Sequence, residues 1–233
     1  MKNIRTMTVT QFRIFPPDLI PFGLIFSPAG TDMIQQVMGF GNVGRNADLI
    51  EIIFRNGSFK IDSDTPPIVV QEMRINARRI IVQVEGSSAV ANQAYYWLKE
   101  LCSRFDENFR DAEPTLLTEE TGSVVELDFD WSSLLNPGLV AAADAFVARS
   151  VDTPVRQYVK TVSVQILIGT RIDDTLTDAG IVTAEKPLTI EPRIDVPLSD
   201  HVFFTRSPAD SETHLALIRD LEARLTKRTV KRR

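Results

Sequence analysis

The sequence predicts an α+β protein, with a mainly antiparallel sheet and about three principal helices packed on one face. Several short stretches alternate apolar and polar residues, which is typical of half-buried strands. Three longer stretches, at 88–105, 137–150 and 207–226, space their apolar residues as helices do. Twice, at 68–105 and 188–226, two strands lead into a helix with a serine at its start. Strand pairs joined by tight turns favour antiparallel pairing, and this repeated pattern suggests two similar ββα-containing halves.

Composition favours one folded protein without a membrane segment. The chain has 233 residues, 43% hydrophobic and 24% charged, which is ordinary for a globular protein. We predict one compact α+β domain over 1–226, with 1–110 and 111–226 as candidate similar halves. No apolar run approaches the ~20 residues that a membrane span needs. The first residues lack the apolar core of a signal peptide, so the cytoplasm is the default location.

Charge is unevenly distributed along the chain. The net charge is −5, yet residues 227–233 hold five of the 26 basic groups and no acid. This basic C-terminal tail is explained most simply by cations that suit a helix C-terminus, whose end then frays. The alternative is contact with the acidic body, a neighbouring subunit or an anionic partner. An acidic body repels phosphate, so duplex nucleic acid is not expected as a partner.

The first third of the chain reads as a strand, a broken apolar segment and a hairpin. Residues 3–15 form a Thr-rich strand before Pro16-Pro17. Segment 18–28 is apolar but interrupted by proline and glycine, which predicts a buried irregular connection or a patch awaiting a partner. Thr31 is a cap for a short helix that ends before Gly39. Asn56-Gly57 between apolar runs predicts a hairpin turn.

The later elements follow from the two hydrophobic periodicities. In the helix 88–105 the apolar positions are Val90, Ala94, Trp97, Leu98, Leu101, Cys102 and Phe105. The expected strands are 68–75, 80–84, 123–131, 158–168, 188–194 and 202–205, with a polar loop at 172–186. The last helix has Ser207 as its expected N-cap and Pro208 at its first position. Its apolar stripe is His214, Leu217, Ile218, Leu221 and Leu225.

The strand 123–131 carries the one set of residues that points to a site. Alternation places Glu126, Asp128 and Asp130 on one face and apolar residues on the other. Carboxylates in a row can hold divalent cations. Because i, i+2 neighbours lie ~6.6 Å apart, the three cannot all ligate one ion directly, and a metal pair would need a further carboxylate from elsewhere in the chain. The simpler interpretation, which we favour, is a strand with one wet and one dry face.

The remaining candidate residues all have a simpler explanation. Residues 39–44 match G-x-G-x-x-G, but the expected order is helix before and strand after, the reverse of a dinucleotide loop. His201 and His214 lack metal-binding spacing, and each follows an aspartate that would orient it as a base. Cys102 is expected to be buried and inert, and Trp97 and Trp131 to anchor the core. The remaining set, expected on a solvated turn, is Arg74, Arg78 and Arg79.

These observations favour a non-enzymatic protein that acts by association, with itself as a homo-oligomer or as a subunit of a larger complex. A sheet edge is the expected contact, with the first strand as the candidate. In this hypothesis the protein needs no cofactor. The alternative is a metal-dependent phosphoryl hydrolase or transferase, in which Glu126, Asp128 and Asp130 hold Mg²⁺ or Mn²⁺.

Overall fold

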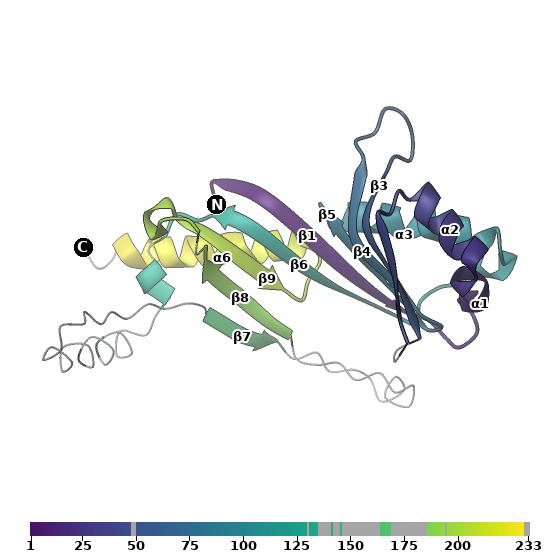
Figure 1. The fold of residues 1–233 in the computed structure, drawn as a ribbon. Helices are drawn as coiled ribbons and strands as arrows, with labels where there is room; N and C mark the ends of the chain where they lie inside the picture. The colour runs from purple at the N-terminus through teal and green to yellow at the C-terminus, as the bar shows by residue number, and fades with distance from the viewer. Residues whose placement is uncertain are drawn as a thin grey trace, which may run out of the picture. The chain divides into compact units, whose positions relative to one another are not determined.

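The computed structural model confirms the α+β class (Figure 1). It describes residues 1–47, 50–129, 131–134, 141, 145, 164–168, 186–193 and 195–230. The strands are β1 (Asn3–Ile14), β2 (Asn42–Asn46), β3 (Glu51–Phe59), β4 (Ile68–Ile75), β5 (Arg79–Glu85), β6 (Leu116–Glu126), β7 (Val164–Ile168), β8 (Lys186–Pro192) and β9 (Val202–Ser207). The α-helices are α1 (Phe22–Phe26), α2 (Pro28–Val37), α3 (Ser88–Ser103) and α6 (Ser211–Val230). The predicted helix 137–150 and loop 172–186 lie outside the described residues.

The chain divides into two compact units whose boundaries interleave. The N-terminal unit comprises Thr6–Gly122 with Pro208–His214. The C-terminal unit comprises Met1–Arg5, Ser123–Ser207 and Leu215–Arg233. Strands β1 and β6 and helix α6 each contribute residues to both units. Whether the units unfold together, as the single predicted domain requires, stays a prediction.

The N-terminal unit is a sheet with its helices on one face. Its strands follow the order β2-β3-β4-β5-β1-β6, and the neighbours from β2 to β1 pair antiparallel. Alternate residues of these strands join one continuous core with residues of α2 and α3, so one face of the sheet carries the helices. Because β1 lies between β5 and β6, the first strand is not the exposed edge that we expected from the sequence.

Segment 18–28 is only partly buried, with Leu24 48% exposed, and it is more regular than its prolines suggested. Ile20 and Ile25 are buried in the core, and residues 22–26 form the short helix α1. Helix α2 then starts at Pro28 rather than Thr31, because the Ser27 Oγ accepts a hydrogen bond from the Gly30 N–H (3.2 Å). Pro21 precedes α1 and Pro28 opens α2, so the prolines mark the starts of two helices.

The predicted hairpin at Asn56-Gly57 is wrong. Strand β3 runs through this dipeptide, and its pairing with β4 continues on both sides, with Arg55 opposite Glu72 and Gly57 opposite Val70. Asn56 takes a φ of 57°, a left-handed conformation that asparagine tolerates better than most residues, so the strand is locally irregular here. A Cβ at Gly57 would lie 2.5 Å from the Phe40 ring, so packing requires this glycine.

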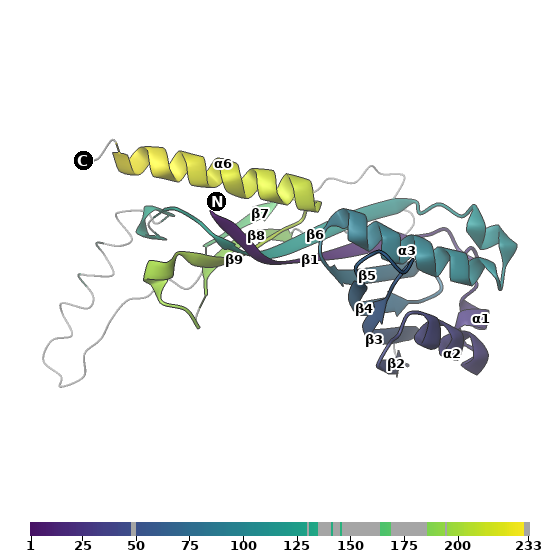
Figure 2. The same cartoon turned by 90° about the horizontal axis from the view of Figure 1, so that it is seen from above.

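The C-terminal unit repeats the same construction. Its strands follow the order β6-β9-β8-β7, and β7-β8 and β8-β9 pair antiparallel. Helix α6 lies along one face of these strands (Figure 2). Its residues Ile218 and Leu225 share a core with Val125, Leu127, Phe129, Trp131, Leu188, Ile190 and Phe203. The chain order β8-β9-α6 matches β4-β5-α3, so the predicted ββα pattern is present in both units.

Two boundaries differ from the prediction. Strand β6 begins at Leu116, seven residues earlier than expected, because residues that read as an acidic loop continue the strand. Helix α6 begins at Ser211, and its cap is Asp210 instead of Ser207: the Asp210 Oδ1 accepts the N–H groups of Glu212 and Thr213 (both 2.9 Å). Among the described residues, none of the helices has the length and apolar character that crossing a membrane requires.

Candidate functional site

The acidic row has the predicted wet and dry faces as far as the structure describes it. Leu127 and Phe129 are buried, whereas the Asp128 side chain is 61% exposed and that of Glu126 25% exposed. The regular strand ends at Glu126, but the Leu127 N–H still donates to the His201 carbonyl (3.0 Å). Asp130 lies outside the described residues, so the row is seen through two of its three members.

Both described carboxylates of the row have basic partners near the N-terminus. The Nε and Nη2 of Arg5 donate to one oxygen of Glu126 (2.9 and 2.7 Å). The Lys2 Nζ lies 3.4 Å from Asp128 Oδ1, and both side chains are mostly exposed, which makes this a weak pair. Within the described ranges no three acidic, histidine or cysteine side chains are arranged to hold a metal. Since Asp130 is not among them, the Mg²⁺ or Mn²⁺ alternative stays a prediction.

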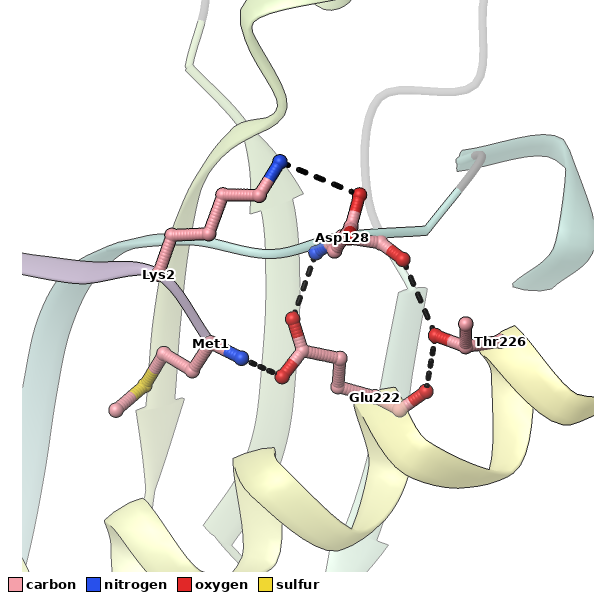
Figure 3. A network of polar contacts seen from close by, with 5 residues as sticks. All are labelled: Met1, Lys2, Asp128, Glu222 and Thr226. Atoms are coloured by element: carbon pink, nitrogen blue, oxygen red, sulfur yellow. Dashed lines mark hydrogen bonds and ion pairs between the residues drawn. The ribbon is translucent and has the colours of Figure 1, made fainter.

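A buried carboxylate, Glu222 of α6, lies next to Asp128 of the acidic row (Figure 3). One of its oxygens binds the amino group of Met1, and the other accepts the Asp128 N–H (2.6 Å). The Thr226 hydroxyl lies within hydrogen-bonding distance of the Asp128 carbonyl (3.1 Å) and the Glu222 carbonyl (2.9 Å). These contacts hold residues 1 and 128 against α6.

Sequence reasoning missed Glu222. The residue lies four positions after Ile218 and three before Leu225, so it occupies a position on the apolar stripe of α6. A lone carboxylate at such a position is the signal that would have found it, because buried acids are nearly always paired. Its partners come from residues 1 and 128, which spacing along the helix does not reveal.

A shallow hollow of about 210 Å³ lies beside the acidic row. Its lining is Lys2, Glu126, Leu127, Asp128, Ser199, Asp200 and His201. The structure thus brings one predicted candidate, His201, next to two others, Glu126 and Asp128. The Ser199 hydroxyl donates to Asp200 (3.3 Å).

The second histidine and the cysteine are buried, as predicted. His214 is fully buried, and this burial lowers its pKa to about 4, so the ring is neutral at pH 7. Cys102 is fully buried as well, and burial raises its pKa to about 12. A thiol with that pKa is a weak nucleophile and does not react readily.

The glycine motif and the arginines also have structural roles. Gly39 follows α2 with a φ of 62°, and a Cβ there would lie 2.4 Å from the Ser58 carbonyl oxygen. Strand β2 comes next, so the order is the predicted reverse of a dinucleotide loop. Arg74 pairs with Glu72 (2.5 Å) and Arg79 with the buried Glu51 (3.0 Å). These two guanidinium groups are matched with carboxylates of the protein.

The two terminal strands of the sheets differ in chemistry. Strand β2 contains an arginine, Arg45, whose guanidinium lies 4.4 Å from the centre of the Phe26 ring. Strand β7 reads Val-Gln-Ile-Leu-Ile and contains no charge. Among the described residues β7 pairs with β8 alone and is the last strand of the order. Natural sheet edges usually carry charges, proline or a covering element that prevents pairing, and β7 itself carries neither charge nor proline.

The sequence matches no protein-family model and no curated protein.

Proposed function

We propose that the protein acts by association rather than catalysis, and that the outer edge of β7 receives a strand of its partner. The observation that carries the proposal is the chemistry of β7, a five-residue uncharged strand that lies last in the order of the described strands. An edge of this kind is a ready template for strand addition, in which backbone hydrogen bonds supply the affinity.

The topology of the N-terminal unit supports this role. Strand β3 precedes β4, β5 and α3 in the chain just as β7 precedes β8, β9 and α6. In strand order, β3 lies three places from β1 and β7 three places from β6. The outer edge of β3 carries β2, a five-residue strand paired from Asn42 to Asn46. The same construction therefore accepts an added strand of this length at the corresponding edge.

The proposal is tested by the native mass of the chain in an extract of cells that produce it. We expect the wild type to elute above the mass of one chain. A lysine at the exposed Gln165 of β7 places a charge on the edge, so Gln165→Lys should elute closer to one chain mass. The matched control is Asn42→Lys on β2, which should elute as the wild type does. A wild type at the mass of one chain contradicts the proposal, as does an unchanged profile for Gln165→Lys.

A further inference from the structure

We infer that the strand added to β7 is the β7 strand of a second copy of this chain, paired antiparallel about Ile166. This inference rests on the proposed function and names its partner. An antiparallel pair centred on Ile166 sets all five residues of one copy opposite five of the other. Ile166 then faces its own counterpart, Gln165 faces Leu167, and Val164 faces Ile168.

The composition of β7 favours a second copy over a charged partner. The strand offers no charge with which an acidic or basic peptide would pair, and self-pairing sets no like charges opposite one another. Each chain carries a net charge of −5, so two copies repel at long range. Contact through an uncharged strand keeps this repulsion low, and added salt should strengthen the dimer by screening the remainder.

Five residue pairs form a small interface, so the dimer is expected to be weak and concentration-dependent. Disulfide cross-linking through an introduced cysteine is the sharper test, because it captures a weak dimer covalently. The single cysteine of the chain, Cys102, is fully buried with a raised pKa, so the background of cross-linking is low. Opposite residues of an antiparallel pair have Cα atoms about 4.5–5.5 Å apart, within the range that a disulfide spans.

The purified full-length Ile166→Cys variant, oxidised under native conditions, should therefore form a disulfide-linked dimer. The matched control is Val164→Cys on the same strand. In the proposed register, residue 164 of one copy lies four residues along the strand from residue 164 of the other, about 13–14 Å away. A disulfide cannot span this distance, so Val164→Cys should remain a monomer.

A second pair of variants covers the case in which Ile166→Cys does not fold. Residues 165 and 167 face each other across the pair but each lies two residues from its own counterpart. A mixture of Gln165→Cys and Leu167→Cys should cross-link to a mixed dimer, and either variant alone should give several-fold less dimer. Equal cross-linking at 164, 165, 166 and 167 would indicate random collision and would overturn the inference.

The outcomes separate this inference from the proposed function. If the purified chain gives no cross-link at any of these positions but elutes as a larger complex in the extract, the second copy is excluded and the proposed function stands. If the extract also shows the mass of one chain, both are overturned. Specific cross-linking at 166, or in the 165–167 mixture, supports both.

Discussion

The buried Glu222 carboxylate holds Asp128, the middle residue of the acidic row, against helix α6. It binds the Met1 amino group and the Asp128 N–H, and removing its charge leaves the buried amino group without a counter-ion. We expect Glu222→Gln to lower the free energy of unfolding by about 1–3 kcal/mol, measured by urea denaturation. The matched control is Asp220→Asn, which removes an exposed pair with Arg224 one turn along the same helix. That change should cost at most about 0.5 kcal/mol, and an equal effect of the two variants would contradict the role of Glu222.

The hypothesis of a metal-dependent enzyme depends on Glu126, Asp128 and Asp130. Glu126 and Asp128 already have Arg5 and Lys2 as partners, so we expect millimolar Mn²⁺ or Mg²⁺ to leave the melting temperature unchanged. A cation that binds only the folded protein would raise it. A rise that Asp128→Ala or Asp130→Ala abolishes would contradict the expectation and restore the phosphoryl-transfer hypothesis.

His214 makes stability depend on pH in the acid range. Burial lowers its pKa to about 4 in the folded protein, against an ordinary value of about 6.5 in the unfolded chain. Between these values the unfolded chain binds the extra proton, so stability is full above pH 6.5 and falls as the pH drops toward 4. The loss attributable to His214 should reach roughly 1–3 kcal/mol.

The measurement is denaturant unfolding at pH 7 and pH 4.5 for the wild type and His214→Leu. Asp210, whose pKa is lowered by hydrogen bonds from Thr213 and Glu212, also loses stabilisation at low pH, and so do other acids. The leucine variant retains those contributions and lacks that of the imidazole. Its stability should therefore fall less between the two pH values, and an equal fall would show that His214 does not titrate as proposed.

At the scale of secondary-structure elements, helix α6 is capped by Asp210 and not by Ser207, the expected N-cap. Asp210 accepts two backbone N–H groups of the first turn and a hydroxyl bond from Thr213 (2.7 Å). We expect Asp210→Ala to destabilise the protein by about 1 kcal/mol in thermal or urea unfolding. Asp210→Asn keeps an acceptor in place and should cost much less. Equal losses for the two variants would argue that the charge, rather than the capping bond, stabilises this helix.

Comparing the predicted with the observed helices and strands shows which sequence patterns are enough to predict an element. Helix α3 and strands β4 and β5 were predicted because their apolar residues repeat at 3.6 or 2 positions, a pattern that burial on one face imposes directly. Asn56-Gly57 misled because asparagine with a positive φ is most often part of a turn, and only the pairing of β3 with β4 shows that the strand continues through this position. The start of β6 was missed because residues 116–122 read Leu-Leu-Thr-Glu-Glu-Thr-Gly, which does not alternate apolar and polar residues.

At the scale of the whole molecule, two separate hydrophobic cores raise the question of cooperativity. Trp97 packs against the core of the N-terminal unit, and Trp131 is buried in that of the C-terminal unit. Because β1, β6 and α6 run through both units, we expect one cooperative transition. The Trp97→Phe variant retains Trp131, which reports on the C-terminal unit. The Trp131→Phe variant retains Trp97, which reports on the N-terminal unit. For each variant, the fluorescence midpoint should coincide with the midpoint of circular dichroism. Two separated midpoints would show that the predicted single domain is two.

The sequence alone determined what depends on local periodicity: the α+β class, most strands, the helices α3 and α6, the burial of Cys102 and His214, and the two faces of the acidic row. Tertiary structure decided what depends on residues far apart in the chain. It placed β1 inside the strand order and β7 at its end, and it set Met1 and Asp128 against Glu222. Neighbouring side chains fix which face of an element is apolar, whereas which strand remains at an edge depends on how every other strand has paired.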